Sequence, residues 1–119
     1  MRLRELLNEA VKPTIEQIVA KHAAKVKDPF NKCAPVSRAL ADDLVKHGYP
    51  ARVIRCSYLL PYARDAHQKW QNLGSQMYWV HYVVRVGNSV FDLTRRQFFP
   101  ESPQPFVQSW ADFKNDWEE

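Results

Sequence analysis

Apolar residues recur at three- and four-residue steps over two stretches of the chain, which is the pattern of amphipathic helices. The first stretch covers residues 3–22 and keeps its phase across Pro13, which predicts a kink or two nearly collinear helices there. The second stretch begins at residue 31 or 32. We expect it to end at Gly48, because glycine readily adopts the left-handed conformation common just past a helix end.

After these helices the chain changes to runs rich in β-branched and aromatic residues. The first run, residues 52–60, predicts a strand over residues 53–58, and two more runs predict strands at residues 76–86 and 89–95. Residues 61–75 form a long loop, interpreted either as a substrate-facing lid or as an ordered connector. Ser109 is the expected N-cap of a short terminal helix. The order of elements predicts an α+β fold in which the second helix packs against an antiparallel sheet.

The turn between the last two strands determines which residues face one another. Gly87-Asn88 is typical of a two-residue hairpin turn, which places Val86 opposite Ser89. Continuing this register puts Val83 opposite Asp92 and leaves His81 on the same face as Asp92. The two side chains are then diagonal neighbours that can meet. A three-residue turn would instead place them on opposite faces.

Composition narrows the class of protein. The 119 residues, 45% hydrophobic and 25% charged, predict one packed domain over residues 1–119. The net charge of +4 is modest and the basic residues are scattered, so a dedicated nucleic-acid role is not favoured. No apolar run approaches the ~18 residues that a membrane-spanning helix needs, so no membrane association is expected. Two cysteines without metal-ligand spacing indicate a reducing, cytoplasmic compartment and neither metal nor cofactor.

Cys33 is the residue around which a reactive site can be built, because it opens the second predicted helix. A helix N-terminus stabilises negative charge and favours the thiolate. His81 could take the thiol proton and Asp92 could orient the imidazole, in the arrangement of a thiol enzyme. Cys56, within a strand, is predicted to be a packing residue only.

Acyl chemistry also needs hydrogen-bond donors for the oxyanion that forms during attack. The backbone N–H of Cys33 is the first candidate donor. Asn31 and the indole of Trp79 are candidates for the second. Trp70, in the long loop, and Arg85, in the following strand, are candidate substrate-binding residues.

These residues resemble the transglutaminase-like branch of the papain-like cysteine enzymes. The likeness rests on a cysteine at the head of a helix, the histidine in Trp79-Val80-His81-Tyr82-Val83-Val84, and Phe91-Asp92-Leu93-Thr94 after a hairpin. The branch includes transglutaminases, arylamine acetyltransferases, lasso-peptide maturation proteases and bacterial deamidase effectors. The resemblance implies a small papain-like core and a Cys33, His81, Asp92 triad acting on amide bonds of a protein or peptide through a thioester. For an effector or toxin-like chain it further implies an immunity or inhibitor protein.

Two other functions are compatible with the same sequence. A non-catalytic interaction module could bind nucleic acid or a protein partner, because aromatic rings beside arginine suit single strands. Its basic aromatic surface would consist of Trp70, Trp79, Arg85, Arg95 and Arg96. Alternatively, the three triad side chains could hold zinc with an open position. The relative placement of Cys33, His81 and Asp92 decides among these hypotheses.

Overall fold

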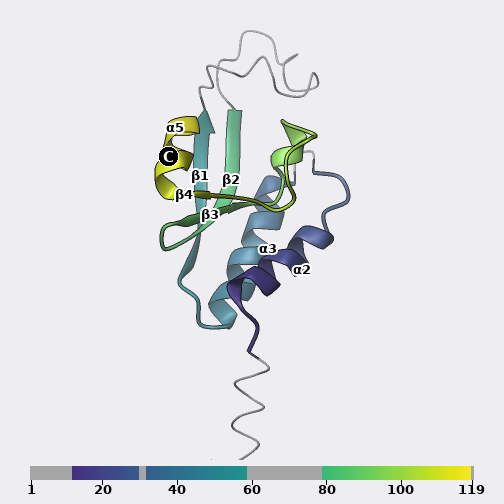
Figure 1. Ribbon diagram of the computed structural model, residues 1–119, viewed down its shortest axis with the longest axis vertical. Coiled ribbons are helices and arrows are strands. Elements are labelled where there is room, and N and C mark those ends of the chain that lie inside the picture. Colours follow the sequence, from purple (N-terminus) through teal and green to yellow (C-terminus); the bar gives the residue numbers. More distant parts are fainter. Residues whose placement is uncertain (1–11, 30–31, 59–78, 119) are drawn as a thin grey trace, which may run out of the picture.

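The computed structural model describes residues 12–29, 32–58 and 79–118. In these ranges the chain forms helices and an antiparallel sheet, the α+β class predicted from the sequence (Figure 1). The helices are α2 (Ile15–Ala24), α3 (Cys33–Lys46), the 3-10 helix η2 (Arg95–Gln97) and α5 (Trp110–Asp116). The strands are β1 (Ala51–Tyr58), β2 (Trp79–Val86), β3 (Ser89–Asp92) and β4 (Phe106–Ser109), in the sheet order β1-β2-β3-β4.

The described part of the first predicted helix, α2, starts after Pro13. Its part up to residue 11 lies outside the described residues, so the kink or the two nearly collinear helices stay a prediction. α2 begins after Thr14, whose extended backbone and side chain form the N-cap. The Gln17 N–H donates to the Thr14 hydroxyl oxygen at 3.1 Å, and the Thr14 N–H donates to the Gln17 side-chain oxygen at 2.9 Å. This capping box satisfies two N–H groups that a helix start leaves unpaired, and so it starts the helix just after the proline.

α3 ends where the sequence predicts. Gly48 has a φ of 89°, a value in the left-handed region that favours glycine. The Gly48 N–H donates to the Val45 carbonyl at 2.9 Å, and the Tyr49 N–H donates to the Leu44 carbonyl at 2.9 Å. This pair of hydrogen bonds is a Schellman motif, which satisfies the last carbonyls of the helix and turns the chain into β1.

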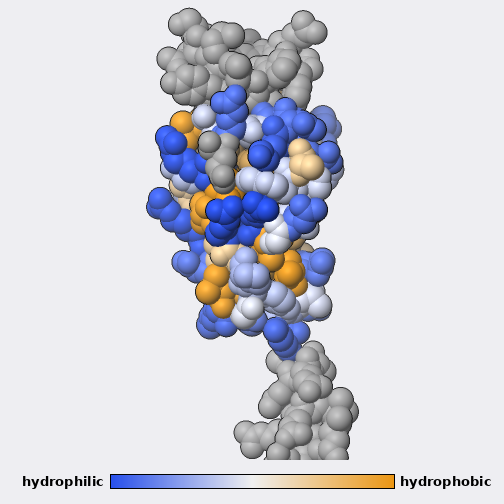
Figure 2. All heavy atoms as spheres, turned by 90° about the vertical axis from the view of Figure 1, so that its left-hand side faces the viewer, coloured by the Kyte–Doolittle hydropathy of each residue, from blue (hydrophilic) through white to orange (hydrophobic). Residues whose placement is uncertain are grey.

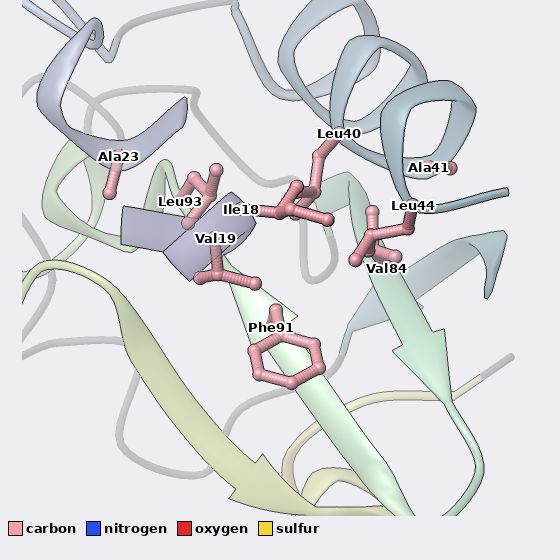
Figure 3. Packing of buried hydrophobic residues seen from close by; sticks show 9 residues of the cluster. All are labelled: Ile18, Val19, Ala23, Leu40, Ala41, Leu44, Val84, Phe91 and Leu93. Atoms are coloured by element: carbon pink, nitrogen blue, oxygen red, sulfur yellow. The ribbon is translucent and has the colours of Figure 1, made fainter. Parts of the chain in front are cut away.

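Each face of the sheet carries a hydrophobic cluster, as the alternation of side chains along strands requires. α2 and α3 lie on one side of the sheet and α5 on the other (Figure 1). The cluster under α2 and α3, shown in Figure 3, consists of Ile18, Val19, Ala23, Leu40, Ala41, Leu44, Val84, Phe91 and Leu93. The cluster on the α5 side consists of Ile54, Cys56, Val83, Val90, Phe98, Phe113 and Trp117. Cys56 is therefore a buried packing residue, as predicted.

The chain returns to the sheet after α5. Ser109 caps this helix as predicted, accepting a hydrogen bond from the Asp112 N–H at 3.1 Å. Glu118 then pairs with Ser57 on the outer edge of β1, where each residue donates its N–H to the other's carbonyl at 2.7 Å. The bridge covers backbone groups that an edge strand leaves exposed. It also holds Trp117 in the core.

The surface on the α5 side shows apolar patches separated by hydrophilic side chains, with no continuous apolar face in that view (Figure 2). Among the described helices, none combines the length and the apolar character needed to cross a bilayer.

The hairpin between β2 and β3 has the predicted two-residue turn, with Gly87 at a φ of 58°. Val86 faces Ser89, as expected, and the ladder continues to Val84 opposite Phe91. It stops there, so the predicted pairing of Val83 with Asp92 is not part of the ladder. β3 also ends at Asp92 rather than at residue 95, because the chain turns into η2.

Candidate active site

The early end of β3 leaves one edge of β2 open at Tyr82. In a strand, the backbone N–H and C=O groups of every second residue point to the same side. Val84 directs these groups to β3, so Tyr82, two residues earlier, directs its own N–H and C=O groups to the same side. α3 occupies this place. The Ser37 hydroxyl donates to the Tyr82 carbonyl at 3.0 Å, and the Tyr82 backbone also hydrogen-bonds the Cys33 thiol. The first turns of α3 thereby bring Cys33 beside the strand that carries His81.

His81 and Asp92 meet on one face of the hairpin, as the register predicted. The His81 side chain is fully buried, and its Nε2 lies 2.8 Å from Oδ2 of Asp92. The other carboxylate oxygen of Asp92 accepts a hydrogen bond from the Thr94 N–H at 3.0 Å, which fixes the carboxylate plane. Since Nε2 is directed to Asp92, Nδ1 is the imidazole nitrogen left for Cys33.

The electrostatics of the site favour charge on both the thiol and the imidazole. Burial lowers the pKa of His81, but the Asp92 carboxylate and then Cys33 outweigh it and raise that pKa to about 9. Burial raises the pKa of the Cys33 thiol, whereas His81 and the backbone of Tyr82 and Ala34 lower it; the net pKa is below that of an ordinary cysteine. Both shifts favour a thiolate–imidazolium pair over a neutral thiol and a neutral imidazole.

Aromatic rings enclose the imidazole. Trp117 stacks on His81 with ring centroids 4.9 Å apart and planes at 29°, and Phe98 meets it edge-on at 5.0 Å and 81°. These contacts hold the ring plane and keep water from the His81–Asp92 hydrogen bond. Nothing in the position of Trp117 along the sequence links it to His81.

Gln97 is a second residue that the sequence did not identify. It is buried at the end of η2, and its Nε2 lies 3.3 Å from Nδ1 of His81 and 3.2 Å from the Thr94 hydroxyl oxygen. The amide nitrogen donates to the Thr94 hydroxyl oxygen and lies against Nδ1 of His81. The only signal in the sequence is a polar residue beside Phe98 and Phe99, which is too general to assign it to the site.

The predicted oxyanion donors fall in part outside the described structure. Asn31 and the side chain of Trp79 lie outside the described residues. Lys32 is the N-cap of α3 and makes no side-chain capping bond, so the first-turn N–H groups are not capped by it. The Cys33 N–H therefore stays a candidate donor.

The structure does not bring Arg85 to the triad. Its guanidinium lies 3.9 Å from the centre of the Trp110 ring, and its Nε donates to the Gly87 carbonyl at 2.7 Å. Arg85 is four residues from His81 on an extended strand, a separation of roughly 13 Å. Arg85 therefore lies at the hairpin turn and not beside His81, and its role in substrate binding stays a prediction. Trp70, the other substrate-binding candidate, lies outside the described residues.

The basic aromatic surface of the binding hypothesis is described only in part, because Trp70 and the side chain of Trp79 lie outside the described residues. Arg95 lies 4.0 Å from the centre of the Phe106 ring, and the Arg96 Nε donates to the Ser102 carbonyl at 2.7 Å. Together with Arg85, all three arginines make contacts within the chain.

The zinc hypothesis does not fit the geometry. In the part of the chain that the structure describes, which includes Cys33, His81 and Asp92, no three His, Cys, Asp or Glu side chains are grouped as a metal ion requires. His81 and Asp92 hydrogen-bond each other directly, so Nε2 of His81 is occupied by the Asp92 carboxylate and is not available to a metal ion.

A scan against protein-family models and searches of curated proteins and of solved structures found no match to this chain. The resemblance to transglutaminase-like enzymes therefore stays a prediction from the sequence. Support for a site at Cys33 comes from the contacts described above.

Proposed function

We propose that this protein is a cysteine-dependent hydrolase or acyl transferase acting on amide groups of a protein or peptide. The observation that carries the proposal is the continuous set of contacts from Cys33 through His81 to Asp92. A half-buried thiol of lowered pKa meets a buried imidazole, and a carboxylate holds that imidazole at 2.8 Å. A thiol, a base and an orienting acid in this order are the components of nucleophilic acyl chemistry.

The reaction follows from the charges of these groups. The Cys33 thiolate attacks the amide carbon, and the carbonyl oxygen takes up negative charge in the tetrahedral intermediate. Protonated His81 then gives its Nδ1 proton to the leaving nitrogen, the C–N bond breaks, and a thioester remains on Cys33. Neutral His81 next takes a proton from water or from an attacking amine, which displaces the thiolate. Attack by water at a glutamine side chain gives glutamate and ammonia; attack by an amine gives a transferred acyl group.

Asp92 acts through the imidazole in this scheme. Its carboxylate fixes the ring so that Nδ1 faces the thiol, and it stabilises the imidazolium before proton transfer. Both Cys33 and Cys56 are free thiols, and a thiol nucleophile is active only when reduced. We therefore place the activity in a reducing compartment such as the cytoplasm.

Alkylation by iodoacetamide at pH 6 tests the nucleophile without knowledge of the substrate. An ordinary thiol of pKa about 8.5 is only roughly 0.3% ionised at this pH. We expect Cys33 to be alkylated at least about tenfold faster in the wild type than in His81→Gln, because the paired thiolate is present only with the imidazole. Buried Cys56 is the internal control, and peptide mapping separates the two sites. Equal rates in the two proteins would contradict the proposal.

A second experiment tests the reaction itself. The wild type and Cys33→Ser are incubated with a glutamine-rich protein such as casein, with and without an added primary amine. Released ammonia and the intact mass of the substrate are measured. We expect ammonia with the wild type only, because serine in place of the thiol is not ionised by His81. Equal ammonia release by Cys33→Ser would exclude Cys33 as the nucleophile.

A further inference from the structure

A cavity of about 560 Å³ lies between α2 and the first half of α3, within the size range of ligand sites. Its apolar lining comes from the loop after α2 and from one flank of α3: Val26, Pro35, Val36 and Ala39. Its polar lining consists of His22, Lys25, Lys27, Asp28 and Lys32. We call this feature the α2–α3 cavity.

The charge around the α2–α3 cavity is predominantly positive. Three lysines stand against one aspartate, and the positive end of the α3 dipole begins at the same place. His22, the remaining polar residue of the lining, is already paired, because its Nε2 lies 2.7 Å from Oδ2 of Asp43. A smaller cavity of about 90 Å³ shares Val26 and Lys27 with the first and adds Arg96. An anionic ligand with an apolar portion is complementary to this surface.

The α2–α3 cavity adjoins the nucleophile. Residues 32, 35, 36 and 39 follow helical spacing and form the flank of α3 that lines the cavity. Cys33, Ser37 and Leu40 form the neighbouring flank, which faces the sheet. Lys32 on the rim directly precedes Cys33, so consecutive residues of one extended ligand can reach both places.

We propose that the α2–α3 cavity binds an acidic segment of the substrate, with an apolar side chain on the floor and carboxylates against Lys25, Lys27 and Lys32. This inference rests on the proposed function in one respect, namely that the bound segment is a substrate. An acidic peptide suits the cavity better than a nucleic acid does, because the floor is apolar and of limited size.

Fluorescence anisotropy with the Cys33→Ala protein tests binding without turnover. The probe is fluorescein-labelled Glu-Glu-Leu-Gln-Glu-Glu, and its counterpart has lysine in place of each glutamate. We expect the acidic probe to bind at least tenfold more tightly than the lysine probe, and less tightly as salt is raised from 50 to 300 mM. No preference between the probes would overturn the proposal.

Three variants on this background locate the site. Lys25→Glu with Lys27→Glu reverses the rim charge, and Lys46→Glu with Lys114→Glu makes the same change on exposed residues away from the cavity. We expect at least tenfold weaker binding for the first pair and less than threefold for the second. Ala39→Trp, which fills an apolar part of the cavity from an exposed position, should also weaken binding at least tenfold. Equal losses in the two lysine pairs, or full binding by Ala39→Trp, would show that the probe binds elsewhere.

Further outcomes distinguish this inference from a nucleic-acid site and from the proposed function. If the single-stranded oligonucleotide dT10 binds more tightly than the acidic probe, the surface is a nucleic-acid site and the peptide proposal is wrong. Conversion of glutamine to glutamate in the probe by the wild type supports both proposals together. Binding in the cavity with no fast alkylation of Cys33 would leave the acidic site standing and remove the proposed function.

Discussion

Replacing Asp92 by asparagine keeps the shape of the side chain but removes the charge that holds His81 protonated. In the wild type the pKa of His81 is raised from 6.5 to about 9, with Asp92 as the largest raising cause. A difference of this size corresponds to about 3 kcal/mol at 1.36 kcal/mol per pKa unit, shared between Asp92 and Cys33. Since His81 is fully buried, we expect Asp92→Asn to lower the free energy of unfolding by about 2 kcal/mol at pH 6.

The pH dependence gives this prediction its sign. A raised pKa in the folded protein stabilises it fully below the ordinary pKa of 6.5, and this stabilisation is lost as pH rises through about 9. The difference in stability between the wild type and Asp92→Asn should therefore be largest near pH 6 and shrink towards pH 10. Urea unfolding followed by tryptophan fluorescence, at intervals across this range, measures it.

Asp112→Asn is the matched control for loss of one carboxylate, because Asp112 is exposed in the first turn of α5. We expect it to change stability by less than about 0.5 kcal/mol, with no trend between pH 6 and pH 10. If Asp92→Asn were as stable as the wild type at pH 6, or if its deficit were constant across the range, a charged His81–Asp92 pair would be excluded.

Three other substitutions test contacts that stabilise the site or the packing of α2 on α3. Trp117→Ala removes a buried ring that stacks on His81 and should cost about 3–5 kcal/mol of unfolding free energy, measured by denaturant titration, while Trp117→Phe should cost clearly less. Ser37→Ala leaves the Tyr82 carbonyl without its hydroxyl donor and should cost about 1–3 kcal/mol in the same assay and slow the alkylation of Cys33. Asp43 has a pKa held below its usual range by Lys21 and then by His22, so Asp43→Asn should lower the thermal midpoint at pH 7. The deficit should begin to shrink as pH falls below about 4, the ordinary pKa of an aspartate, and should vanish only as the carboxylate of the folded protein is itself protonated at lower pH.

The pairing of His81 with Asp92 could be predicted from the sequence because it depends on one local feature. A two-residue turn fixes the parity of the hairpin, and parity alone decides that both side chains share a face. Cys33 at a helix start was equally local. The meeting of this helix with β2 was not predictable in detail, because it depends on where β3 stops.

β3 ends at Asp92 because a side-chain hydrogen bond of this residue competes with the backbone hydrogen bonds of the sheet. The Asp92 carboxylate accepts the Thr94 N–H, and such local bonds favour turns over continued strands. The turn leads into η2, which places Gln97 against His81. The local hydrogen bond between Asp92 and Thr94 therefore determines the contact between Gln97 and His81, which are distant in sequence. The periodicity of the sequence does not predict this contact.

Two other features of the fold depend on particular contacts. The helical phase across residues 3–22 predicts a kink at Pro13 or two nearly collinear helices, and the capping box at Thr14 fixes the start of α2 just after the proline. Arg85 was predicted to be a substrate-binding residue. Its contact with Trp110 depends on α5 folding back over the sheet, which spacing along β2 does not report.

The contact between Trp117 and His81, together with the bridge from Glu118 to Ser57, bears on how the site forms. Trp117 lies 84 positions after Cys33 in the sequence. The imidazole of His81 contacts both residues. Contacts of such sequence separation form late and depend on most of the chain being in place. We therefore expect the proposed reactivity of Cys33 to require the fully assembled fold, and its rate of alkylation during denaturant titration should fall together with the global unfolding signal.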